Sequence, residues 1–253
     1  SPGLTYTADT DRDITTFNCD THFIQGTSMA SPVAAGCVAL VRQYFEEGWY
    51  PAGNPVPAAA FDPSAALVKA VLIAGAVDMT GVFGSPPSRA EGWGRIHLDN
   101  SLYFDGDRRK LIAFDEQGSF SSGSDPAWET TIRLGGRAEA GVVRIVLTWT
   151  DYPADPAATT ALVNDLDLRA ESLLSGEIFY GNRIDDGFSG PGGPPDRLNN
   201  VEVIILPLNT RDVYRLTVQP WRITEGPQSF ALAAGGDVML SEPTSAGDWE
   251  EYR

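Results

Sequence analysis

The stretch QGTSMASPVAAGCVALV, residues 25–41, decides how this chain is interpreted. It contains no charged residue. Small and apolar side chains recur in it at three- and four-residue spacing, at Met29, Val33, Gly36 and Leu40. This spacing predicts a helix from Ser28 to about Glu47. Alanine fills many of the other positions, so we expect neighbouring elements to pack closely against this helix.

Two roles are open for Ser28, at the start of that helix. Serine is a favoured helix N-cap, because its hydroxyl accepts a hydrogen bond from a free backbone N–H. The alternative is catalysis of acyl transfer. Gly26 permits close approach of a ligand to the backbone, and a helix N-terminus offers N–H groups and a positive dipole end. These features suit a nucleophile whose reaction creates an oxyanion beside it.

The rest of the first part alternates strands and helices. Residues 1–27 predict a strand, an Asp-rich loop and a second strand that ends at Gly26. After a loop over 48–63, the segment 63–76 predicts a helix with Ser64 as its cap. Residues 91–102 predict a turn and a short helix. We place the boundary of this first part near residue 106.

Strands replace helices from about residue 110. Eight short segments, several of them alternating, predict strands at 110–116, 128–134, 141–151, 162–172, 177–181, 199–207, 212–220 and 229–236. Val143, Ile145, Leu147 and Trp149 alternate with Arg144, Val146 and Thr148. The pattern favours an all-β sandwich or jelly roll over 107–240, followed by an acidic tail over 241–253. The long Gly- and Pro-rich loop 185–200 is expected to be functional or held in place by something.

Composition limits the partners and the redox chemistry. The net charge is −16, with 34 acidic residues against 18 basic ones, so nucleic acid and anionic membranes are poor partners. No apolar run reaches the ~20 residues that span a bilayer. Cys19 and Cys37 make no disulfide framework, and Cys37 in the helical run is expected to be a small buried thiol.

The segment GTSMASP, residues 26–32, resembles the nucleophile motif of the subtilisin-like serine proteases (subtilases, peptidase family S8). Ser1-Pro2-Gly3 is similar to the turn that precedes this motif, and ALVKAVLIAGA and GWGRIHLDNSL resemble the C-terminal helices and closing turn of the family. In the second part, LTWTDYP, LVNDLDL, NNVE and GPQSFAL resemble the C-terminal sandwich of the oxidatively stable alkaline proteases. The resemblance covers nearly the whole chain.

The resemblance implies a fold and an activity. The expected fold is the C-terminal portion of a parallel-sheet α/β domain, followed by a jelly-roll-like sandwich of about eight strands. The expected activity is that of an endopeptidase that acts through an acyl-enzyme on Ser28 and needs no organic cofactor. The protein is expected to be secreted. The backbone N–H of Ser28 would help to bind the oxyanion, and Gly26 and Thr27 would line the substrate cleft. Met29 would lie behind the serine.

A catalytic serine needs a base and a group that orients the base. In subtilases the chain order is Asp, His, Ser, whereas only 27 residues precede Ser28. We interpret His22 and His97 as structural or surface histidines, and Asn18 as too near Ser28 to be the oxyanion asparagine. The chain is therefore expected to be an inactive C-terminal fragment, whose partner is the N-terminal part that carries Asp and His. Helices of 1–106 should expose apolar faces, and 107–240 should resist proteolysis.

Three aspartates suggest a metal. In LVNDLDL, residues 162–168, alternation places Leu162, Asn164, Leu166 and Leu168 on one face, and Asp165 and Asp167 on the other. The paired carboxylates form either a solvated acidic face or part of a calcium site, which takes 6–8 oxygen ligands. The resemblance implies a structural calcium ion at Asp167 and Asp196, and calcium would explain how the loop 185–200 is held.

A non-catalytic role is the alternative function. The β-rich part would then bind carbohydrate or protein, or would stabilise its own catalytic domain. Trp149, Tyr152, Trp221 and Phe230 are the candidate binding aromatics, although core packing accounts for most of them better.

Overall fold

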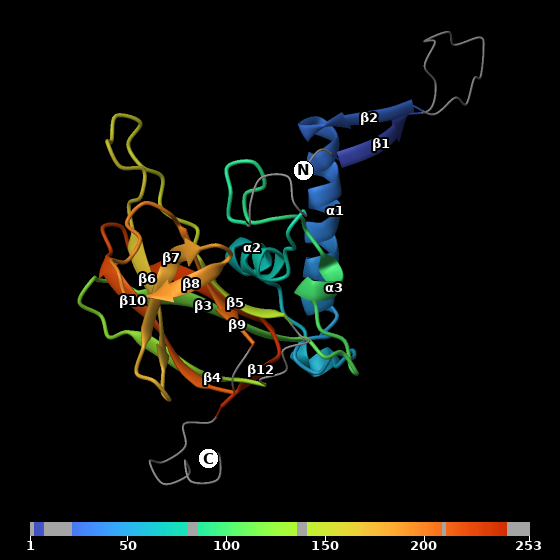
Figure 1. Cartoon of the computed structure of the whole chain (residues 1–253). Coiled ribbons are helices and arrows are strands. Elements are labelled where there is room, and N and C mark those ends of the chain that lie inside the picture. Colours follow the sequence, from blue (N-terminus) through green and yellow to red (C-terminus); the bar gives the residue numbers. More distant parts are fainter. Residues whose placement is uncertain (1–2, 8–21, 80–85, 136–140, 209–210, 242–253) are drawn as a thin grey trace, which may run out of the picture.

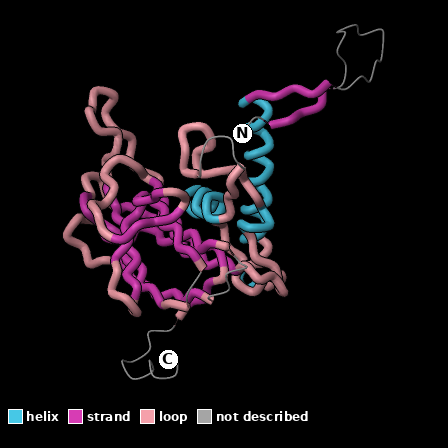
Figure 2. Tube along the Cα trace, in the orientation of Figure 1, coloured by secondary structure: helices cyan, strands magenta, loops and turns pink. Residues whose placement is uncertain are grey.

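The computed structural model describes residues 3–7, 22–79, 86–135, 141–208 and 211–241, with only the backbone for 3–7 and 22–25. The predicted Asp-rich loop, Asn18, Cys19 and the tail from residue 242 lie outside the described residues. A body of strands is flanked by helices, and a long helix stands beside it (Figures 1 and 2).

The first elements form a hairpin that leads into the long helix. Strand β1 (Gly3–Thr7) pairs antiparallel with β2 (His22–Gly26), with Gly3 opposite Gly26. Helix α1 (Thr27–Glu46) follows β2 without a loop, and the hairpin lies at its N-terminal end (Figure 1). Its last turns bury Val41, Tyr44 and Phe45.

Three short helical elements follow. They are η1 (Pro57–Ala59), α2 (Ala65–Ala74) and α3 (Leu98–Ser101). The Ser64 hydroxyl accepts a hydrogen bond from the Leu67 N–H at 3.0 Å, so the predicted cap of α2 is confirmed. Seven of the ten residues of α2 are buried, because the helix is covered on several sides.

Two antiparallel sheets make up the remainder. The four-stranded sheet has the order β3-β11-β5-β9, and the six-stranded sheet has the order β12-β4-β10-β6-β7-β8. Their strands are β3 (Lys110–Phe120), β4 (Trp128–Leu134), β5 (Val142–Thr148), β6 (Asp165–Ser172), β7 (Ile178–Asp185), β8 (Phe188–Pro191), β9 (Val201–Pro207), β10 (Val213–Arg222), β11 (Gln228–Gly236) and β12 (Val238–Leu240). All eight predicted segments overlap a strand, and β8 falls inside the predicted loop 185–200.

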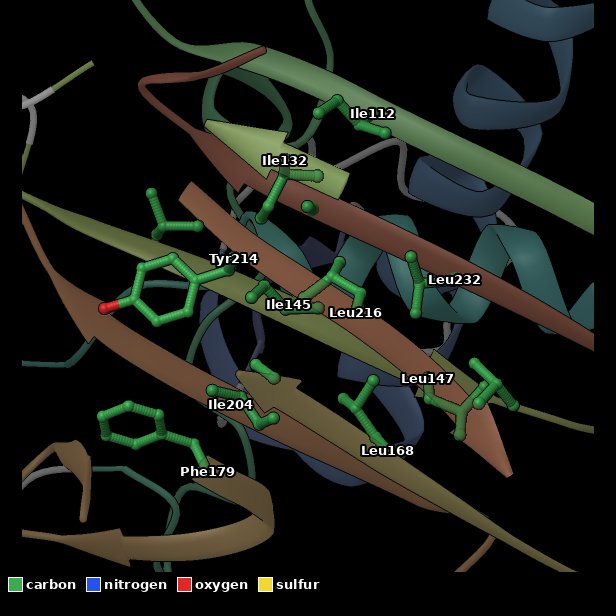
Figure 3. Close-up of a cluster of buried hydrophobic side chains, with 14 of the residues drawn as sticks. Ile112, Ile132, Ile145, Leu147, Leu168, Phe179, Ile204, Tyr214, Leu216 and Leu232 are labelled. Carbon is green, nitrogen blue, oxygen red and sulfur yellow. The ribbon is translucent and has the colours of Figure 1, made fainter. Parts of the chain in front are cut away.

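The main hydrophobic core lies between the two sheets. Ile145 and Leu232 from the smaller sheet meet Leu168 and Leu216 from the larger one (Figure 3). The Trp149 ring also belongs to this core, and its indole N–H donates to the Asn164 carbonyl at 3.1 Å. Burying these side chains is the main stabilising contribution to this half of the molecule.

A second core lies on the other face of the four-stranded sheet. Helix α2 and the end of α1 pack there against residues from all four strands, including Leu111, Val146, Val203 and Ala231. In β11 this face carries only Ala231, Ala233 and Gly235, so the backbone of α2 approaches closely. The second core therefore includes residues on both sides of position 106.

The predicted α/β fold class is wrong. Every strand pairing among the described residues is antiparallel, and α1 and α2 cover an antiparallel sheet. A parallel sheet requires strands joined by crossover connections, whereas β1 and β2 form a hairpin and pair with each other. The molecule as described is mostly β, with two antiparallel sheets instead of a parallel-sheet domain.

Candidate functional site

Ser28 is the second residue of α1, and it is exposed. The N-cap is Gly26, and no side chain caps this helix end. Ser28 is therefore not the N-cap of α1. Thr27 is exposed and Gly26 is half-buried, and a Cβ at position 26 would lie 3.6 Å from the Met29 sulfur. Gly26, Thr27 and Ser28 thus lie together on an open helix terminus.

The first turn of α1 is electrostatically suited to an anion. It holds no acidic side chain, and the free N–H groups of a helix N-terminus carry a partial positive charge. Pro32, inside the helix, has no N–H to donate to the carbonyl oxygen of Ser28 four residues earlier. A hydroxyl in this turn lies next to donors that could stabilise a developing oxyanion.

The first two-thirds of α1 are only partly covered by the described residues. No residue from Thr27 to Leu40 is buried, and none is charged. Val33 is 57% exposed, Val38 36% and Leu40 51%. Cys37, expected to be buried, is half-buried. A helix that is apolar on all sides is normally enclosed by protein, so this surface requires a covering element.

The two histidines do not join Ser28 in any contact that the described residues show. His22 lies in β2, where only the backbone is described. His97 is the N-cap of α3, and its Nδ1 accepts a hydrogen bond from the Asn100 N–H at 3.3 Å. His97 therefore has a structural role, as the sequence predicted.

The three candidate metal ligands lie near one another, but an arginine stands among them. Asp165 and Asp167 are 2% and 6% exposed, so the solvated-face alternative is wrong. The Arg197 Nη2 donates to Asp167 at 3.0 Å, its Nη1 donates to the other Asp167 oxygen, and Nη1 lies 3.5 Å from Asp165. Burial raises the pKa of Asp165 to about 6, against the opposing effect of Arg197, and burial also raises the pKa of Asp167.

Asp196 is directed to other partners. Its carboxylate accepts hydrogen bonds from the side-chain amides of Asn182 at 2.5 Å and Asn199 at 2.6 Å, and from the Leu198 N–H at 2.8 Å. Burial opposes the charge of this carboxylate, but these hydrogen bonds outweigh burial and lower its pKa. Asp196 thus holds the loop in place through hydrogen bonds to Asn182, Leu198 and Asn199, and these occupy the carboxylate.

Sequence reasoning missed two members of this cluster, Arg197 and Glu202. Glu202 is fully buried, one of its oxygens accepts from the Leu168 N–H at 2.6 Å, and the other has no hydrogen-bond partner. Burial raises its pKa well above the usual range. The sequence does contain a signal for Glu202. It lies between Val201 and Val203 in an otherwise apolar strand, where charged residues are rare.

The model of the subtilase family matches residues 4–94, which include the hairpin, Ser28, α1 and α2. This part of the chain belongs to the subtilase family. The match places the exposed Ser28 in a segment that the family shares.

Curated relatives carry protease names. Three proteins of Dictyostelium discoideum, named serine protease/ABC transporter B family proteins tagD, tagB and tagA, are 31%, 31% and 30% identical to this chain. The alignments cover 84%, 85% and 88% of the chain, so the likeness continues into the β-rich part. The chain spans only 14%, 13% and 13% of those relatives.

The calcium expected at Asp165, Asp167 and Asp196 stays a prediction, and their arrangement does not favour it. Within the described part of the chain, no three His, Cys, Asp or Glu side chains are grouped so that they could hold a metal ion. Both oxygens of Asp167 are engaged by Arg197, and Asp196 is engaged by Asn182 and Asn199. These residues do not fit a site that needs 6–8 free oxygen ligands.

Proposed function

We propose that the chain is the serine-bearing part of a subtilisin-like endopeptidase that cleaves peptide bonds through an acyl-enzyme on Ser28. The observation that carries the proposal is the exposed Ser28 at an uncapped helix N-terminus, within the segment that matches the subtilase family. Gly26 and Thr27, beside it, would contact the substrate backbone.

The base and its orienting acid are proposed to come from an N-terminal part of the same protease. The uncovered apolar surface of α1 supports this proposal, because Val33, Val38 and Leu40 need a partner to exclude water. Without that part the Ser28 hydroxyl lacks a base, so this chain alone should be inactive. The proposal that the protein is secreted is based on the family resemblance alone.

Among the described helices none is long and apolar enough to cross a membrane.

Labelling with a fluorophosphonate probe tests the endopeptidase proposal. The full-length protein should be labelled, and Ser28→Ala should abolish the labelling. The matched control is Ser31→Ala, which removes another exposed hydroxyl from the same helix and should leave labelling intact. This chain alone should not react. Equal labelling of full-length protein with and without Ser28 would contradict the proposal.

A second proposal concerns the β-rich part, which would stabilise the serine-bearing part. Side chains from the sheet hold both ends of α2. Asp115 accepts from the Ser64 N–H at 2.7 Å and from the Ser64 hydroxyl at 2.6 Å, at the N-terminus. Arg144 donates to the carbonyls of Ile73 at 3.0 Å and Ala76 at 2.8 Å, at the C-terminus. An acid at the first end and a cation at the last both complement the helix dipole.

Carbohydrate or protein binding by the sheets has less support. Trp149 and Phe230 belong to the main core, which leaves Tyr152 and Trp221 as exposed aromatics. The Trp221 ring lies under the guanidinium of Arg197, at 4.4 Å from its centroid. The stabilising role is thus the non-catalytic function that the contacts favour.

Limited proteolysis tests the stabilising role. The second core joins α2 to the sheet, so the resistant product should begin near Val41 and extend to about residue 240, instead of beginning near 107. Early cleavage is expected in the uncovered part of α1. A resistant product that begins after residue 106 would mean that the sheet folds without α2, and would support the division at 106 instead.

A further inference from the structure

The loop that connects β8 to β9 carries Arg197, whose guanidinium lies among acidic side chains. Arg197 contacts Asp167 with two guanidinium nitrogens and lies 3.5 Å from Asp165. Two parallel N–H···O contacts to one carboxylate give a fixed geometry, and Arg is suited to them by its planar fork. The contact therefore fixes the position of the loop relative to β6.

A positive charge stabilises the buried acidic side chains near Arg197. Asp165 and Asp167 are almost fully buried, and Glu202 behind them is completely buried with one unpartnered oxygen. Buried carboxylates are costly unless they are paired, because the interior screens and solvates charge poorly. The charge of Arg197 is attracted by Asp167, Asp165 and Glu202, and these attractions outweigh burial and raise its pKa.

Further contacts hold the arginine and the loop in place. The guanidinium lies over the Trp221 ring on β10, at 4.4 Å from the centroid, a distance at which cation–π attraction is significant. Next to it, Asp196 binds Asn182, Asn199 and the Leu198 N–H, which closes the turn that carries Arg197. The loop is thus attached to β6, β7 and β10 by side chains of this chain alone.

We propose that Arg197 is a built-in counter-ion that replaces a structural metal at this position, so that the loop 185–200 is held without calcium. Both oxygens of Asp167 accept from Arg197, and the carboxylate of Asp196 accepts from Asn182 and Asn199, so these oxygens are not free to bind calcium. Removal of the guanidinium leaves the buried side chains of Asp165, Asp167 and Glu202 without this cation.

Thermal unfolding of this chain with calcium and with EGTA tests the proposal. The melting temperature of the unsubstituted chain should be the same in both. Arg197→Ala should melt roughly 6–12 °C lower in both solutions, since it leaves buried charges unpaired. The control is Arg215→Ala, which removes one cation from β10 that pairs at 3.6 Å with Glu171, and it should lower the melting temperature by about 2 °C or less.

A second variant keeps the test decisive if Arg197→Ala does not fold. Adding Asp167→Asn to Arg197→Ala removes one of the uncompensated charges and should recover folding. A melting temperature of the unsubstituted chain that rises with calcium and falls with EGTA overturns the proposal. So does an Arg197→Ala protein that is no less stable than Arg215→Ala. These results do not depend on protease activity.

Discussion

Arg144 connects the C-terminal end of α2 to the four-stranded sheet. It lies on β5, is 6% exposed, and donates to the carbonyls of Ile73 at 3.0 Å and Ala76 at 2.8 Å. A third contact, to Trp93, is long at 3.4 Å. Arg144→Met removes the donors but keeps most of the apolar stem, so it isolates the contribution of the guanidinium.

Two opposing effects set the magnitude. Hydrogen bonds to a charged group contribute about 1.5–3 kcal/mol each, so the two short ones contribute about 3–6 kcal/mol. Burial, with a smaller effect of Arg109, lowers the pKa of Arg144 to about 10, which corresponds to a cost of about 3 kcal/mol for the charge. The difference of about 0–3 kcal/mol predicts that Arg144→Met lowers the free energy of unfolding by about 1.5 kcal/mol, or the melting temperature by about 3–6 °C.

Hydrogen exchange locates the effect. Amides of residues 65–76 should exchange about tenfold faster in Arg144→Met, because α2 detaches more often, whereas amides in β10 should change less. Arg215→Met, on the exposed side of β10, serves as the control. If Arg144→Met melts at the same temperature as the control, the contact does not stabilise α2 and the reasoning fails.

Three further substitutions probe other parts of the structure. Asp115→Ala removes both hydrogen bonds to Ser64 and should cost about 1–2 kcal/mol by chemical denaturation, and an unchanged midpoint would contradict the capping contact. Trp149→Phe loses the indole hydrogen bond to Asn164 and leaves a cavity, so the same measurement should show a loss of about 2 kcal/mol; a loss below 0.5 kcal/mol would show that the core adapts. Leu40→Glu should change the stability of this chain by less than about 0.5 kcal/mol and reduce its self-association in light scattering. The same substitution should destabilise the full-length protein. Unchanged stability of both proteins would mean that nothing covers α1.

The amino-acid sequence by itself determined the local features. The motif around Ser28, the strand segments, the Ser64 cap and the shared face of Asp165 and Asp167 all follow from residue type and periodicity. Each depends on neighbours within a few residues, and the helical and strand periods record those neighbours in the sequence.

Only the tertiary structure decided which segments meet. The sequence placed Arg144 on a strand face, but the burial of that face depends on α2, about 70 residues earlier, packing over it. Arg197 is one charged residue in a polar loop until the chain returns it to Asp167, 30 residues away. Antiparallel pairing and the pairing of Arg197 with Asp167 both depend on contacts between segments far apart in the sequence, because these contacts bury the two surfaces against each other. The spacing of residues within one segment does not specify which distant segment it contacts.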